Sequence, residues 1–421
     1  MQIQSGFRRA ALSCLLPLVA LNLHTAQAGS ATWNANPANS DWNTATNWTP
    51  NTVPNGASDV ATFATSSRTA VSISAPIEVS SIVYNSGANA FTITVAHDSA
   101  LAVSGPGVVN NSGITQQLVA DQGTSAPGNL TFTNSATAGD ATLVANAGTN
   151  GGAGGVISFS QNALGGTGRC ELFGNGSLDL SQLLAPGTTI GSLEGDGLVF
   201  LGARNLTVGS NDLTTTFSGV IQDGGAGGGT GGSLTKLGRG YLTLTSANTY
   251  TGGTIINDGK LTVNNTTGSG TGPGPVQDPG GNLTGNGIVA GAVTVGGVNR
   301  TIAVLAPGSR QAATFTIQGS LTFAVSGNYD WSFAGNLRRV RFDQVFADGV
   351  VINDRTGFNF FPSGTLGVGT VLTVINNTSA SPIAGTFSNL ADGAIITTNG
   401  GKFQANYEGG DGNDLTLTVV P

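Results

Sequence analysis

Apolar residues alternate with threonine in short runs along most of the chain. The apolar–Thr–apolar unit begins at Phe91, Leu130, Leu206, Leu242, Leu261, Val293, Phe315, Leu321, Leu372 and Leu415. Side chains of a β-strand alternate between its two faces. The pattern therefore predicts strands whose apolar pairs point into a core and whose threonines face solvent. Threonine is β-branched and suits a solvated strand face, so the predicted class is all-β.

Glycine-containing turns separate these predicted strands at intervals of about twenty residues, the length of one solenoid coil. Leu242 and Leu261 are 19 residues apart, and Val293 and Phe315 are 22 apart. Other intervals are 32 to 36 residues, which we interpret as units separated by one weaker strand. Because turns repeat as well as strands, the pattern favours a β-solenoid over a string of β-sandwiches. We expect about twelve to fifteen coils in a stack roughly 60–70 Å long.

The segment Ser233–Asn265 carries this pattern most completely and reads SLTKLGRGYLTLTSANTYTGGTIINDGKLTVNN. It contains K-x-G-x-G-x-L-T-L, N-T-Y-T-G-G-T and D-G-K-L-T-V. On these motifs it resembles the autotransporter-associated β-strand repeat of bacterial surface proteins, also called the passenger-associated transport repeat. The resemblance implies export and a right-handed, single-stranded parallel β-helix. Asn248 and Asn257 lie at predicted corners, where we expect turn roles; bonding to an equivalent Asn in the next coil is the alternative.

The two ends of the mature chain differ from its middle. Three of the four tryptophans, Trp33, Trp42 and Trp48, lie within 16 residues. A solenoid needs a cap over its open core, so we interpret residues 29–64 as a Trp-rich N-terminal cap; a sugar-stacking platform is the alternative. We assign residues 65–326 to the solenoid. In residues 327–421 the repeat weakens and aromatic residues concentrate, which predicts a C-terminal β region that caps the stack.

Residues 1–28 have the features of a cleavable signal peptide. Arg8 and Arg9 precede an apolar run, and Ala26-Gln27-Ala28 provides a cleavage site before Gly29. The run is too short for a transmembrane helix, and we expect none elsewhere. The sequence thus predicts a protein secreted from a bacterium or held at its surface.

Charge excludes two classes of partner. The chain has 15 basic and 22 acidic residues, a formal net charge of −7. Removing Arg8 and Arg9 leaves 13 basic residues against 22, a difference of −9. Nucleic acids and anionic membrane surfaces need a basic face, so neither is an expected partner. The only basic cluster, Arg338-Arg339-Val340-Arg341, is interpreted as a solvated strand face or loop.

Few residues remain that could perform nucleophilic or metal chemistry. The mature chain keeps one histidine, His97, and one cysteine, Cys170, so an internal disulfide is impossible. A Ser-His-Asp site needs a positioned base, and His97 is interpreted as a surface residue at a strand end. Zinc needs three or four ligands, which this pair does not supply.

Carboxylates offer a second kind of candidate chemistry. Gly409–Asp414 is similar to a calcium-binding Gly-Gly-x-Gly-x-Asp repeat, but a single copy favours a β-turn. Asp330 with Asp343, or Asp411 with Asp414, could hydrolyse or eliminate a polysaccharide. No pair is singled out by its spacing. We therefore expect no catalytic, cofactor-binding or metal-binding residues and no cofactor.

The preferred hypothesis is a non-catalytic, structural or adhesive β-helix protein of the autotransporter passenger type. The alternative is a polysaccharide lyase or glycoside hydrolase, or a carbohydrate-binding module, on the same scaffold. Glycans or other cell-surface components are the expected partners. The chain ends at Pro421, with no room after the last predicted strand for the β-barrel of self-exporting relatives. We therefore expect an unidentified export or anchoring partner.

Overall fold

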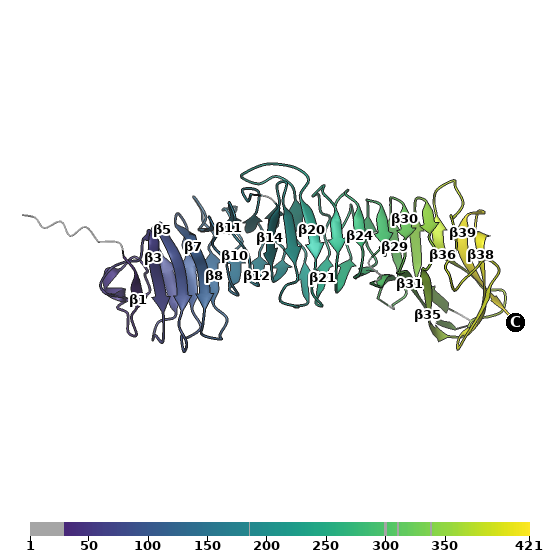
Figure 1. Cartoon of the computed structure of the whole chain (residues 1–421), viewed down its shortest axis with the longest axis horizontal. Helices are drawn as coiled ribbons and strands as arrows, with labels where there is room; N and C mark the ends of the chain where they lie inside the picture. The colour runs from purple at the N-terminus through teal and green to yellow at the C-terminus, as the bar shows by residue number, and fades with distance from the viewer. Residues whose placement is uncertain (1–28, 185, 299–300, 310, 337–338) are drawn as a thin grey trace, which may run out of the picture.

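The molecule is a long rod in which strands stack side by side from one end to the other (Figure 1). The computed structural model describes residues 29–184, 186–298, 301–309, 311–336 and 339–421; the predicted signal peptide, 1–28, lies outside them. The only helix among the described residues is a single 3₁₀ turn, η1 (Ala45–Asn47). The rod is a parallel β-solenoid of about 12 turns, which confirms the predicted fold class.

A 14-stranded sheet runs nearly the whole length of the rod. All of its pairs are parallel except that of β31 with β32. Its spatial order is β32 (Arg339–Phe342), β31 (Gly327–Asn336), β28 (Ala303–Pro307), β25 (Asn282–Gly285), β23 (Lys260–Val263), β21 (Tyr241–Leu244), β18 (Thr215–Phe217), β15 (Ser192–Gly195), β12 (Arg169–Leu172), β10 (Thr142–Ala145), β8 (Gln117–Ala120), β6 (Thr92–Val95) and β4 (Ala70–Ile73), with β35 (Gly357–Gly364) also paired to β31.

Two further sheets form the other walls of the N-terminal and central coils. The 10-stranded sheet has the order β19 (Val220–Gln222), β16 (Leu198–Phe200), β13 (Ser177–Asp179), β11 (Val156–Phe159), β9 (Asn129–Phe132), β7 (Ala100–Asn110), β5 (Ile77–Tyr84), β3 (Gly56–Phe63), β1 (Ala31–Trp33) and β2 (Trp48–Thr49). The 8-stranded sheet has the order β14 (Gly187–Ile190), β17 (Asn205–Val208), β20 (Ser233–Lys236), β22 (Thr254–Ile256), β24 (Val276–Asp278), β27 (Val293–Val295), β30 (Leu321–Phe323) and β34 (Val350–Ile352).

A 7-stranded sheet closes the C-terminal end. Its order is β26 (Ile288–Val289), β29 (Thr314–Ile317), β33 (Gln344–Ala347), β36 (Val371–Asn377), β39 (Asp414–Val420), β38 (Gly401–Gly409) and β37 (Ile395–Thr398). Its first four strands pair in parallel, and its last four pair antiparallel. The sheet therefore changes from a solenoid wall into a capping hairpin region.

The cross-section of the coil changes along the rod. From β4 to β11, strands alternate between the 14-stranded and 10-stranded sheets, so each coil has two long walls. The 8-stranded sheet begins at β14 and adds a third wall as far as β19, where the 10-stranded sheet ends. From β20 to β25 the strands alternate between the 8-stranded and 14-stranded sheets. The 14-stranded sheet continues through this change without a break.

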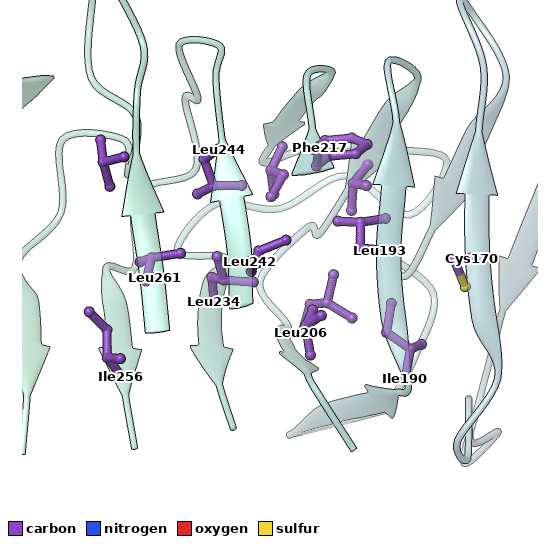
Figure 2. Packing of buried hydrophobic residues seen from close by; sticks show 14 of the residues in the cluster. Cys170, Ile190, Leu193, Leu206, Phe217, Leu234, Leu242, Leu244, Ile256 and Leu261 are labelled. Atoms are coloured by element: carbon purple, nitrogen blue, oxygen red, sulfur yellow. The ribbon is translucent and has the colours of Figure 1, made fainter. Parts of the chain in front are cut away.

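The core consists of apolar side chains stacked in register along the axis. In the 14-stranded sheet, Leu242 lies opposite Leu261, and Leu261 opposite Leu283. Figure 2 shows Leu242 and Leu261 pointing inward, with Leu234 and Ile256 of the 8-stranded sheet across the core. The intervening Thr243 and Thr262 lie on the outer face and are half-buried by their neighbours. The predicted alternation is therefore confirmed in this segment.

The long intervals between threonine units have a different cause from the one predicted. Leu206–Val208 lies in β17 of the 8-stranded sheet, whereas Leu242–Leu244 lies in β21 of the 14-stranded sheet. The 36-residue interval between Leu206 and Leu242 therefore separates strands of two different sheets. It does not indicate one weak strand between two neighbouring units. Within the 14-stranded sheet, successive inward positions such as Leu242, Leu261 and Leu283 are 19 and 22 residues apart.

Asn248 has a larger role than the turn predicted for it. Its side chain is buried at a corner, where Oδ1 accepts from the Ile221 N–H at 2.7 Å. Its Nδ2 donates to the Gly270 carbonyl at 2.6 Å. The amide thus joins the backbones of the preceding and following coils, and neither partner is the equivalent Asn side chain. Asn257 is exposed, and its backbone N–H donates to the Lys236 carbonyl.

The three N-terminal tryptophans are buried against one another. The Trp33 and Trp48 rings are 5.1 Å apart, and those of Trp42 and Trp48 are 4.8 Å apart, both edge to face. Each indole N–H donates to a backbone carbonyl. Such rings offer no exposed face to a sugar, so the predicted alternative of a stacking platform is wrong, and the rings seal the end of the core instead.

The C-terminal end is packed with aromatic rings. Trp331 and Phe333 of β31 contact Phe403 of β38, with ring centroids 6.4 and 5.4 Å away. Phe358 lies 5.4 Å from Phe387, again edge to face. These rings fill the space between the last coils and the antiparallel hairpin. Capping structure therefore covers both ends of the stack.

Candidate functional site: a polar cleft on the transport-repeat segment

A cleft of about 440 Å³ lies on the outer face of the 14-stranded sheet. It spans neighbouring strands β21, β23, β25, β28 and β31, together with the corners that precede them. It is lined by Arg239, Tyr241, Asp258, Gly259, Lys260, Gly280, Asn282, Thr284, Ala306, Ser309 and Asp330. The first five of these residues belong to Ser233–Asn265.

Strand register brings the lining side chains into rows. Tyr241 lies opposite Lys260, and Lys260 lies opposite Asn282. The next outward row runs through Thr262 and Thr284, whose hydroxyl oxygens are 3.0 Å apart. Because alternate side chains point outward and neighbouring strands lie about 4.8 Å apart, each coil adds one polar group to each row.

Lys260 is held across the cleft by two weak contacts. Its Nζ lies 4.5 Å from the centroid of the Tyr241 ring, in a cation–π contact. The same ammonium donates to the Ser309 hydroxyl at 3.4 Å. Tyr241 is half-exposed, so the aromatic ring and the ammonium are both accessible. A ring, a cation and a hydroxyl therefore meet at one place on the surface.

Arg239 lies on the corner before β21, and its side chain is exposed at the same end of the cleft. Its backbone N–H donates to Asp212 Oδ1 at 2.7 Å, which fixes the corner. In the described part of the chain, ion pairs are confined to Arg169 with its two glutamates and His97 with Asp98. Arg239 and Lys260 consequently have no carboxylate partner there.

A buried lysine supports the floor of this end of the cleft. The Lys236 ammonium donates to the carbonyls of Leu237, Gly238 and Asp258. Burial lowers the pKa of Lys236 to about 8, although nearby Asp258 and Asp212 oppose this shift. The lysine of K-x-G-x-G therefore ties the corner before β21 to the corner before β23.

Glycine is required where these two corners touch. Gly259 has φ +67°, and a Cβ added to it would lie 2.1 Å from the Gly238 carbonyl oxygen. Gly238 has φ +68°, and its Cβ would lie 2.0 Å from the Gly209 carbonyl oxygen. Positive φ and this close stacking explain why glycine stands at Gly238 in K-x-G-x-G and at Gly259 in D-G-K.

Two carboxylates also line the cleft. Asp258 Oδ1 accepts from the N–H of Gly259 at 2.7 Å, as a corner residue commonly does. Asp330 lies on β31, and its Oδ1 accepts from Asn359 Nδ2 at 2.8 Å. Asp258 sits at the Tyr241 end of the cleft, and Asp330 comes from the last strand that lines it.

The two members of the predicted pair lie in different places: Asp330 is on the surface and Asp343 is in the interior. Asp343 is fully buried, and its carboxylate accepts from the backbone N–H groups of Ala313 and Ser332 and from the Ser332 hydroxyl. Burial raises the pKa of Asp343, although these hydrogen bonds lower it. Its oxygens join strand ends, whereas Asp330 alone lines the cleft.

The Gly409–Asp414 motif forms the turn between β38 and β39, as its β-turn interpretation predicted. Asp414 Oδ1 accepts from the Asn377 N–H at 2.9 Å, and burial raises the pKa of Asp414. Asp411 is exposed on the same turn. The described residues contain no group of three or more His, Cys, Asp or Glu side chains that could hold a metal ion.

His97 and Cys170 lie apart from the cleft. His97 is exposed just beyond the end of β6, with Nδ1 3.0 Å from Asp98 Oδ2. Cys170 is buried inside the core (Figure 2), and burial raises the pKa of its thiol to about 12. A thiol with that pKa is a poor nucleophile at neutral pH.

One carboxylate cluster has no counterpart among the sequence-based candidates. Glu171 of β12 and Glu194 of β15 are opposite each other in the 14-stranded sheet and share Arg169. Burial raises the pKa of Glu171, Arg169 lowers it, and Glu194 raises it. The two glutamates are 23 residues apart, which is the length of one coil here. Their pairing could be recognised from the sequence only if the coil lengths were already known.

No helix in the described ranges is long and apolar enough to cross a membrane. Among curated proteins, no significant relative of the chain was found. Residues 234–263 match the family model of the passenger-associated transport repeat. The match covers β20, β21, β22 and β23, which are two strands of the 8-stranded sheet and two of the 14-stranded sheet. The chain therefore carries a passenger-associated transport repeat, built into the wall of a parallel β-solenoid.

Proposed function

We propose that the protein is an exported, non-catalytic adhesin of the autotransporter passenger type that binds glycans at a bacterial surface. One observation carries this proposal: the transport repeat at 234–263 also supplies the residues at one end of the polar cleft. The repeat supports export of a passenger-like protein. The cleft supplies a recognition surface on the same coils.

The cleft has the chemistry that a saccharide needs. Sugars present hydroxyl groups that pair with amides, hydroxyls and charged side chains, and C–H faces that pack on aromatic rings. Asn282 and Ser309 provide the polar groups, and Tyr241 provides the ring. The long outer face of a repeat protein adds further contact area.

Polysaccharide cleavage is less well supported than binding. Asp343 and Asp414 are engaged by backbone N–H groups, so they serve the fold. Glu171 and Glu194 are both paired with Arg169. The cleft does contain Asp258 and Asp330, so a test for glycan cleavage accompanies the binding experiment.

The proposal includes processing and organisation. Residues 1–28 are removed on export, and an additional export or anchoring factor cooperates with the mature chain. Residues 29–64 act as the N-terminal cap, 65–326 as the solenoid and 327–421 as the C-terminal capping region.

The experiment expresses the full chain in a Gram-negative host and follows three properties of the exported protein. We expect N-terminal sequencing to begin near Gly29, externally added protease to reach the protein, and a glycan array to show binding. A reducing-end assay on the bound glycans should show no turnover. Catalytic release of reducing ends would establish the enzyme instead, and an absence of all glycan binding would refute the adhesive proposal.

A further inference from the structure

The Tyr241 end of the cleft concentrates positive charge in an acidic protein. The chain has a formal net charge of −7 and only three lysines, Lys236, Lys260 and Lys402. Two of these three, together with Arg239, lie within 25 consecutive residues at this end. Because the protein as a whole is acidic, the basic residues at this end are a local concentration and do not reflect a generally basic surface.

Part of the negative charge nearby is offset by a cation that no ligand can reach. Asp258 and Asp212 both interact favourably with the buried ammonium of Lys236. Lys236 donates to backbone carbonyls below the surface, so its single charge offsets one of these two carboxylate charges from beneath. Together with the exposed Arg239 and the half-buried Lys260, three cations face two carboxylates at this end, which leaves one net positive charge for an external anion.

Lys260 is positioned for such an anion. The Tyr241 ring and the Ser309 hydroxyl hold its ammonium over the cleft, and neither contact neutralises its charge. An ammonium has three N–H donors, so at least one remains for a ligand. The Arg239 guanidinium adds a planar pair of donors that matches a carboxylate or a sulfate.

The rest of the cleft is too large and too polar for a simple inorganic anion. Its volume of about 440 Å³ extends over five neighbouring strands of the sheet. Beyond the two cations it presents the amide of Asn282, the hydroxyl of Ser309 and, at β31, the carboxylate of Asp330. These groups match the hydroxyls of a sugar chain that continues away from its acidic group along the rod.

We propose that this cleft selects acidic glycans, with the anionic group of one sugar bound between Arg239 and Lys260. The adjoining sugars lie over Asn282 towards Asp330. This inference rests on the proposed glycan-binding function and specifies its ligand class and its site. The acidic group is a carboxylate or a sulfate, which share the recognition chemistry.

The test measures binding of the full exported chain to three trisaccharides by isothermal titration calorimetry. The probes are trigalacturonate as the carboxylate ligand, a sulfated trisaccharide and neutral maltotriose. We expect at least one acidic probe to bind about tenfold more tightly than maltotriose, because a charge-assisted hydrogen bond is stronger than a neutral one. Comparing the acidic probes identifies the anionic group. Raising the salt concentration should weaken acidic binding selectively.

Two variants locate the site. Arg239→Ala and Lys260→Ala should each weaken acidic binding about tenfold and weaken maltotriose binding by a smaller factor, so that the preference for the acidic probe falls. Lys402→Ala is the matched control, because it removes the same charge where Nζ contacts the Pro421 carbonyl, outside the cleft. Thermal melting of each variant confirms that it is folded. Arg239→Lys should restore only part of the affinity, because it keeps the charge and loses the planar fork.

The possible failures are distinguishable. Equal binding of neutral and acidic probes, or unchanged acidic affinity in both folded cleft variants, would overturn the inference and leave glycan adhesion standing. Failure of all three probes together with an empty glycan array would overturn the adhesive function as well. Loss of acidic binding in Lys402→Ala equal to that in Lys260→Ala would show a general charge effect and also overturn the assigned site.

Discussion

Leu261→Ala tests the register on which the assignment of inner and outer faces depends. Leu261 is fully buried, and it lies between Leu242 and Leu283 in the stacked core. Its strand is hydrogen-bonded to a neighbour on both sides, so the surrounding wall cannot close easily over the space that the substitution leaves. Leu→Ala costs about 2.7–5.0 kcal/mol, and more when a cavity persists, so we expect about 3.5–5 kcal/mol.

Thr262→Ser is the matched control on the next residue of the same strand. Its side chain lies on the outer face, and serine keeps the hydroxyl that contacts Thr284. We expect a loss of about 0.5 kcal/mol or less, as for most surface substitutions.

The assay is urea unfolding of the full chain followed by far-ultraviolet circular dichroism. Repeat proteins can lose cooperativity, so the urea dependence of the unfolding free energy must be the same in both variants before their stabilities are compared. Equal losses in the two variants, or a larger loss for Thr262→Ser, would refute the assigned faces.

Three further predictions concern single groups. Burial raises the pKa of Asp278 from 3.8 to about 7, so its folded carboxyl keeps a proton that the unfolded chain has lost. The stabilising contribution of this protonated carboxyl is complete below pH 3.8 and disappears as the pH rises through 7. Asp278→Asn should flatten the pH dependence of the urea midpoint in that window. An unchanged pH dependence in the variant would contradict this. Asn248→Ala leaves two buried backbone groups without their partner and should cost about 2–4 kcal/mol in the same urea assay; a loss below about 1 kcal/mol would mean that water replaces the amide. Gly259→Ala combines positive φ with a steric conflict, whereas Gly113→Ala has φ +71° and open space around its Cβ, so thermal melting should show the larger loss for Gly259→Ala.

The alternation of apolar residues with threonine was sufficient to predict the strands and their faces where coils stack regularly. It failed at Thr416, which is buried although the same pattern surrounds it. There, a register shift in β38 brings Gly409 against the Thr416 side chain. The threonine rule describes an uncovered solenoid wall, and an antiparallel hairpin that folds back on itself does not satisfy that condition.

The cleft could not be predicted because its residues come from several coils. Tyr241 and Lys260 alternate with buried leucines, so their outward direction was readable from the sequence. Their proximity to Ser309 and Asp330 depends on the lengths of the intervening coils, which vary and which the spacing of threonine units did not give correctly. The same limit hid the cluster formed by Glu171 and Glu194.

The unbroken 14-stranded sheet also has a consequence for how such a rod can change in size. Each coil bonds mainly to the coils before and after it, and an extra wall enters at β14 without interrupting that sheet. A segment gained or lost on the other walls therefore changes the cross-section of the rod only locally. The backbone alignment of distant coils stays unchanged. Whole coils could be duplicated or excised in the same way, provided that the cut ends present matching strand registers. The architecture thus lends itself to lengthening, shortening and grafting of single coils, in nature or by engineering.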